Sequence, residues 1–94
     1  MATGTAIVNF AGAAPGVLSQ ASLDVAGQAG IAAGSLVEAW VRPVASAEHS
    51  ADEHVVEQLK IVAGNIVAGT GFTVYAEIAN GKSYGNWNVN WVWV

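Results

Sequence analysis

The chain has 94 residues, no cysteine, 11% charged residues and a formal net charge of −4. This length accommodates one domain, which we expect to span 1–94. The absence of cysteine excludes a disulfide framework, a thiol nucleophile and a thiolate metal site. Because 53% of the residues are apolar, a disordered chain is also excluded.

The distribution of charged residues limits the classes of partner that the protein is expected to bind. The three basic residues are Arg42, Lys60 and Lys82, too few for the basic stripe that neutralises phosphates, so we expect no nucleic acid. A basic membrane patch is missing for the same reason. The uncharged stretch 1–23 is rich in glycine, alanine and threonine, and no positive region precedes an apolar block. We therefore expect neither a membrane segment nor a signal peptide.

Period-two alternation of apolar and polar residues predicts β-strands along most of the chain. The predicted strands are 5–10, 21–26, 36–44, 59–68, 72–78 and 84–94. Gly64–Asn65 predicts a bulge or tight turn within the fourth strand. Asn80–Gly81 predicts a type I′ hairpin between the last two strands, because both residues tolerate a positive φ. In the last strand, apolar positions on one face alternate with asparagine on the other until Val92.

One segment departs from this pattern. The polar stretch 46–58 holds four of the seven acidic residues and both histidines. Ser50 followed by Glu53 matches a capping box, so a short helix or an irregular crossover is expected. Together with six or seven short strands, this predicts an all-β fold: a single small antiparallel β-sandwich or jelly-roll-like barrel with a polar crossover at 46–58.

The polar segment raises the question of a metal site. Imidazole and carboxylate groups together could hold a divalent ion. The residues considered as weak metal candidates are His49, Asp52, His54 and Glu57. The HExxH order is not met, so a solvated acidic loop or a polar contact with a neighbouring subunit is favoured, and no metal or cofactor is predicted. Protonation of the two histidines near pH 6.5 would make the segment sensitive to pH.

The same residues offer little for catalysis. A serine nucleophile needs a base and an orienting group, and no G-x-S-x-G motif is present. A catalytic mechanism with paired carboxylates is formally possible for Asp52, Glu53 or Glu57. No apolar surroundings that would raise the pKa of one of them are visible in the sequence. We therefore predict no catalytic residues and no enzymatic activity.

The aromatic residues near the carboxyl end allow three interpretations. Trp87, Trp91 and Trp93 lie in phase on one face of the predicted strand, with Tyr84, Tyr75 and the distant Trp40 elsewhere. Core packing or an oligomer interface is favoured over stacking on sugar rings. The residues predicted to contribute to an interface are Trp40, Trp87, Trp91, Trp93, His49, Glu53 and His54.

Three long motifs carry a family resemblance. They are GQAGIAAGSLVEAW at 27–40, HSADEH at 49–54 followed by Glu57 and AGNIVAGTGFTVY at 63–75, and the YGxWxVxWVW pattern at 84–93. Together they resemble small, uncharacterised proteins encoded in the structural-gene regions of tailed bacteriophages and prophages. The resemblance covers the chain from about residue 3 to the end.

This resemblance implies a virion structural protein made in the host cytoplasm. The expected role is that of a capsid decoration (cement) protein, which binds the assembled head and stabilises it by mass action. The expected partners are the major capsid protein or other virion proteins, and homo-oligomerisation is expected, with a trimer favoured. The alternative is a tail-fibre or head-fibre domain that binds host-surface carbohydrate.

Overall fold

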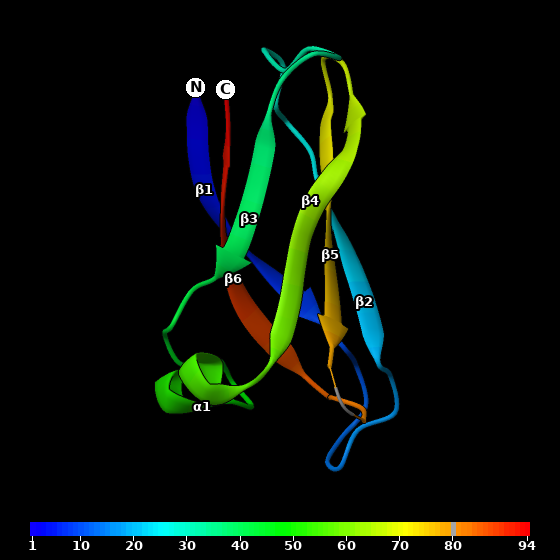
Figure 1. Cartoon of the computed structure of the whole chain (residues 1–94), viewed down its shortest axis with the longest axis vertical. Coiled ribbons are helices and arrows are strands. Elements are labelled where there is room, and N and C mark those ends of the chain that lie inside the picture. Colours follow the sequence, from blue (N-terminus) through cyan, green and yellow to red (C-terminus); the bar gives the residue numbers. More distant parts are fainter. Residues whose placement is uncertain (80) are drawn as a thin grey trace.

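The computed structural model describes residues 1–79 and 81–94, which form two packed sheets and one short helix (Figure 1). The strands are β1 (Ala2–Asn9), β2 (Gln20–Val25), β3 (Val37–Val41), β4 (Leu59–Val67), β5 (Gly71–Ile78) and β6 (Asn86–Trp93), and the helix is α1 (Ala51–Val56). The predicted all-β sandwich with a polar crossover is therefore confirmed.

Each sheet contains three antiparallel strands. β6 lies between β1 and β3 in the first sheet, and β5 lies between β2 and β4 in the second. Figure 1 shows the two sheets side by side, with β3 next to β4. The sheets do not close into a barrel, so of the two architectures expected from the sequence the sandwich is correct.

Alternation along the strands decides which side chains enter the core. The buried hydrophobic residues are Val8, Phe10, Ile31, Phe72, Val74, Ala76, Ile78, Trp87, Val89 and Trp91. Burying a side chain of the Val or Phe type contributes about 1.5–3 kcal/mol. Phe72 of one sheet meets Trp91 of the other edge to face, with ring centroids 5.4 Å apart. This contact joins the two sheets at the centre of the core.

The Trp91 ring approaches β1 closely because residue 4 of that strand is glycine. A Cβ atom at Gly4 of β1 would collide with the indole ring of Trp91. Gly4 and Trp91 are register partners on neighbouring strands, so the ring fills the space that a side chain on β1 would occupy. The predicted irregularity in β4 is also present, because its register with β5 shifts between Gly64 and Val67, and Asn65 has a φ of 50°.

The predicted hairpin between the last two strands is wrong. Asn80 itself lies outside the described residues, but β5 and β6 belong to different sheets, so the chain crosses from one sheet to the other between them. Both strands are central and already have a neighbour on each side. A local turn preference cannot pair two strands whose edges are both occupied by other strands.

Candidate functional site

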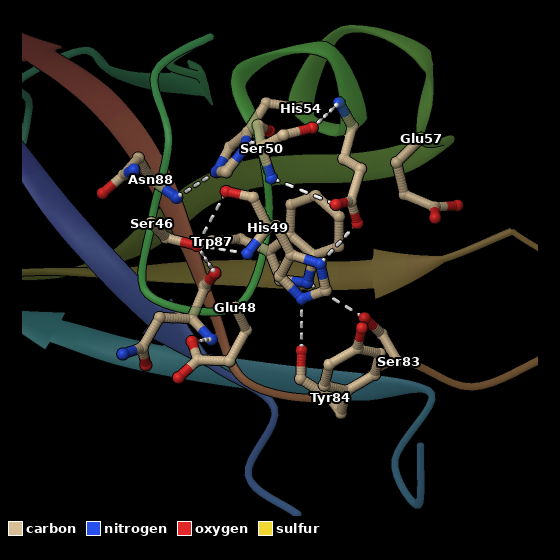
Figure 2. Close-up of polar contacts among 12 residues, drawn as sticks. Ser46, Glu48, His49, Ser50, His54, Glu57, Ser83, Tyr84, Trp87 and Asn88 are labelled. Carbon is tan, nitrogen blue, oxygen red and sulfur yellow. Dashed lines mark hydrogen bonds and ion pairs between the residues drawn. The ribbon is translucent and has the colours of Figure 1, made fainter. Parts of the chain in front are cut away.

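The polar segment 46–57 forms a structured plug at one end of the sandwich, next to the first half of β6 (Figure 2). The predicted capping box is present. The Ser50 side chain accepts a hydrogen bond from the Glu53 backbone N–H, and the Glu53 carboxylate accepts one from the Ser50 N–H. These two bonds satisfy backbone donors at the start of α1, which explains why a helix of only six residues forms.

His54 replaces a strand partner. Its ring is 2% exposed. Nδ1 lies 2.8 Å from the Ser50 carbonyl oxygen, and Nε2 accepts a hydrogen bond of 3.0 Å from the Asn88 backbone N–H. Since the carbonyl can only accept and the amide can only donate, the neutral ring with its proton on Nδ1 satisfies both contacts. His54 thereby satisfies a β6 donor just beyond the end of β3.

The His49 ring differs from the His54 ring because both of its nitrogens face hydrogen-bond acceptors. Its Nε2 lies 2.7 Å from the Tyr84 carbonyl oxygen, and its Nδ1 lies 2.8 Å from Glu53 Oε2. Both partners are acceptors, so a ring with two protons satisfies both, and the contact with Glu53 is then an ion pair. The His49 ring also stacks on the Trp87 indole, with centroids 3.7 Å apart and planes at 14°, a favourable position for a cation.

The contact with His49 affects the pKa of the Glu53 carboxylate. The pKa of Glu53 lies below its usual value, first because the His49 side chain hydrogen-bonds it and next because the Ser50 backbone N–H donates to it. A carboxylate that accepts several hydrogen bonds is stabilised in its charged form. Glu53 therefore holds the His49 ring and caps α1 at the same time.

Further hydrogen bonds tie the plug to residues that precede and begin β6. Ser46 Oγ donates to the Asn86 carbonyl oxygen at 2.6 Å, and Glu48 Oε1 accepts from the Asn86 backbone N–H at 2.7 Å. The Glu48 side chain packs where Gly85, at a φ of 65°, leaves room for it. A merely solvated acidic loop, one of the two arrangements favoured from the sequence, does not describe a segment with this many internal bonds. A polar contact with a neighbouring subunit, the other arrangement, stays a prediction.

The plug offers no metal centre or catalytic pair among the described residues. His49, Asp52, His54 and Glu57 do not converge, and no group of three or more potential ligands is found in residues 1–79 and 81–94. Both nitrogens of each buried ring are already engaged. Within the same residues, no serine hydroxyl hydrogen-bonds a histidine ring. Both histidine rings pack against Trp87 and cover its indole.

The structure separates the four tryptophans that were grouped as interface candidates. Trp87 is 1% exposed and Trp91 is 7% exposed, so both rings belong to the core of this chain. Trp93 is partly buried, and its Nε1 donates to Gln28 Oε1 at 2.9 Å. Trp40 is 46% exposed and lies on the outer side of its sheet. Trp40 is therefore the most exposed of the four tryptophans, while His49 and His54 are buried in the plug.

Trp40 belongs to an apolar face on the outside of the β1–β6–β3 sheet. We define this face by Ile7, Leu36, Trp40, Val92 and Val94, which alternation and register place on the same side. The register also places polar residues on this side, namely Thr3, Thr5, Glu38, Asn88 and Asn90. Leu36 is 72% exposed, and a shallow groove runs between it and Val92 and Val94. Glu38 is the one charged residue within these three strands. Leu36, Val92 and Val94 line one groove, and large exposed apolar side chains that gather in this way mark interaction sites.

A second surface lies on the outside of the β2–β5–β4 sheet, around Tyr75, which is 44% exposed. Tyr75 lies on the central strand and shares its outer side with Glu77 and with Lys60 of β4. From the sequence alone, Tyr75 is expected only as one of the aromatic residues outside the tryptophan face of the last strand. The alternation of 72–78 already indicated that Tyr75 and Glu77 share a face, but the strands that flank them depended on the topology.

Comparison with known proteins adds no family to these observations. No family model matches the chain, and neither a curated protein nor a solved structure is significantly similar to it. Within the described residues, no helix has the length and apolar character needed to cross a membrane.

Proposed function

We propose that this protein is a non-enzymatic structural component of a bacteriophage virion, a capsid decoration protein that binds the assembled head through its apolar face. The observation that carries the docking surface is the exposed Trp40 ring, together with Leu36 and Val94, on a sheet that bears one charge. The virion assignment rests on the resemblance of the three sequence motifs to phage structural proteins.

The physical argument is one of mass action. Trp and other large apolar side chains are enriched at the centres of protein interfaces, where their burial supplies much of the binding free energy. A protein that binds the assembled shell, but not its separated subunits, stabilises the shell by the free energy of binding. The low charge of the face matches a contact driven by apolar burial rather than by electrostatic steering.

The experiment measures occupancy on purified heads. Heads lacking the protein are incubated with wild-type chain, and the bound copies are counted by quantitative mass spectrometry. Trp40→Thr removes the exposed indole while retaining a residue suited to a strand. Val67→Thr, on the other sheet and 52% exposed, is the matched control.

We expect hundreds of wild-type copies per head, a loss of at least tenfold in affinity for Trp40→Thr and no change for Val67→Thr, since a tenfold change corresponds to about 1.4 kcal/mol. Heads with bound protein should also resist heat better than bare heads. A protein found in only a few copies at the tail or fibres would contradict head decoration. Equal binding by both variants would contradict docking through the apolar face.

A further inference from the structure

The outer side of the β2–β5–β4 sheet carries a second groove, separate from the apolar face. It has a volume of ≈ 260 Å³ and is lined by Gln20, Ala21, Lys60, Val62, Tyr75, Ala76 and Glu77. We call it the Tyr75 groove. All three strands of the sheet contribute to it, and none of its residues belongs to the plug or to the apolar face. The proposed docking function leaves this surface unused.

The aromatic ring in this groove stands on the central strand of the sheet and is partly exposed to solvent. Tyr75 lies on the central strand, opposite Ser22 of β2 and Val62 of β4. Its ring edge lies 4.0 Å from the position that a Cβ of Gly64 would occupy, so the ring extends over Gly64, where β4 has no side chain. Because the strand is paired on both sides, binding of a ligand here would require little ordering of the backbone.

Polar groups lie one row along the strands from the ring. Glu77 of β5 is the register partner of Gln20 on one side and Lys60 on the other. Gln20 Nε2 donates to Glu77 Oε2 at 3.2 Å. In the part of the chain that the structure describes, Lys60 forms no ion pair with Glu77. The groove therefore offers a carboxylate and an amide as acceptors, and an amide and an ammonium as donors.

From this combination we infer that the Tyr75 groove binds a neutral saccharide, with a hexopyranose ring stacked on Tyr75 and its hydroxyl groups hydrogen-bonded by Gln20, Lys60 and Glu77. The apolar C–H face of a pyranose ring suits the negatively charged face of an aromatic ring. Vicinal hydroxyl groups suit neighbouring donors and acceptors. The opposite charges of Lys60 and Glu77 favour a neutral ligand over an anionic one.

The size of the groove sets the extent of the ligand. Small-molecule pockets have volumes of about 300–1,000 Å³, so a smaller, shallow groove holds only one or two sugar units of a longer chain. We therefore expect weak affinity for a short oligosaccharide and a gain from many copies on one particle, since linked sites bind a repeating ligand far more tightly than single sites do. Trp87 and Trp91 are buried, so neither of these rings can stack on a sugar.

The test uses the full chain and defined probes: maltotriose, cellotriose and lactose, titrated by saturation-transfer NMR and calorimetry. Tyr75→Ala removes the ring, Tyr75→Phe retains it without the hydroxyl, and Glu77→Gln removes the charge of the carboxylate. Trp40→Thr, which removes the exposed aromatic ring of the other sheet, is the matched control. Circular dichroism and thermal unfolding verify that each variant is folded.

We expect at least one probe to bind with a dissociation constant below about 10 mM. Tyr75→Ala should weaken this binding about tenfold, Tyr75→Phe should change it less than about threefold, and Trp40→Thr should leave it unchanged. Absence of binding by all three probes would overturn the inference, as would equal losses in Tyr75→Ala and Trp40→Thr.

Measurements of saccharide binding and of head occupancy distinguish failure of the Tyr75 groove from failure of the docking function. Loss of head occupancy in Tyr75→Ala, without saccharide binding by the wild-type chain, would identify the groove as a protein contact and would also overturn the inference. Saccharide binding by a chain that does not decorate heads would support the groove and contradict the docking function alone.

Discussion

Each end of β6 carries a core-facing tryptophan, but the surroundings of the two indole rings differ. At the plug end, the Trp87 indole donates to Ser83 Oγ at 2.9 Å and is covered by the His49 ring. At the other end, the buried Nε1 of Trp91 has no hydrogen-bond acceptor among the described residues, and Val94 beside Leu36 remains exposed. The chain closes one end of its core with its own polar segment and presents apolar surface at the other.

The difference between the two ends predicts that substitutions there have different effects on folding stability and on binding. The plug end is a network in which each buried polar group has a partner, and the loss of one member leaves others unpaired at a cost of about 1–3 kcal/mol each. The apolar end has side chains whose removal leaves no buried polar group without a partner. Mutations at the plug should therefore affect the folding of the isolated chain, whereas mutations on the apolar face should affect binding.

The largest effect is expected for His54→Ala. This change leaves the Asn88 N–H without its acceptor and opens a cavity beside Trp87. The Ser50 carbonyl loses the bond from the His54 ring and keeps the one from the residue 54 backbone N–H. We expect a loss of about 3–5 kcal/mol in the free energy of unfolding, measured by urea denaturation. Val55→Ala, at an exposed position on the same helix, should change it by less than about 0.5 kcal/mol. Similar losses in the two variants would contradict a specific role for the buried ring.

A matched pair of substitutions compares the two ends directly. Trp87→Phe removes the hydrogen bond to Ser83 and reduces the stacking with His49, so we expect a loss of about 2–4 kcal/mol. Trp91→Phe removes an indole N–H that has no acceptor, and the relief of that unpaired donor offsets part of the cavity cost. We expect a loss below about 1.5 kcal/mol. Thermal and urea unfolding measure both, and the reverse order would refute the proposed difference between the ends.

The ion pair of the plug predicts a pH dependence. The pKa of Glu53 is lowered in the folded chain, so the unfolded chain takes up this proton first as the pH falls below the usual value of 4.5. The stabilisation from this carboxylate is complete above that value and is lost as the pH falls through the lowered pKa. The stability difference between wild type and Glu53→Gln should therefore shrink as the pH falls from about 5.5 toward 3.

Unfolding curves collected across this range provide the measurement. Asp52→Asn, an acidic residue of the same helix outside the hydrogen-bond network, is the control, and its difference from wild type should change less. A Glu53→Gln difference that stays constant down to pH 3 would show that the carboxylate is not the origin of the pH dependence. Sensitivity of the segment to histidine protonation near pH 6.5 stays a prediction.

The smallest effect on the isolated chain is expected for Leu36→Ser on the apolar face. Leu36 is 72% exposed, so its truncation should change the free energy of unfolding by less than about 0.5 kcal/mol. The same substitution should weaken binding to heads, because the side chain borders the groove of the apolar face. A large loss of stability without a loss of binding would place Leu36 with the plug residues in function.

Local patterning predicted the strands well and their partners poorly. The in-phase positions Trp87, Val89 and Trp91 do face the core, since alternation follows from the backbone of any extended strand. The Asn80–Gly81 signal led to the wrong pairing of β5 and β6, because a turn preference is local whereas sheet partners lie far apart in the sequence.

The chain of 94 residues with few charges and no cysteine was enough to determine an all-β domain, its inward faces and the capping box at Ser50, since these depend on neighbouring residues and the period of the backbone. Only the tertiary structure decided that His49 and His54 are buried against β6 and that Trp40 is the exposed tryptophan. The physical reason is that burial of a polar ring depends on hydrogen-bond partners about 35 residues away in sequence, which no local pattern specifies.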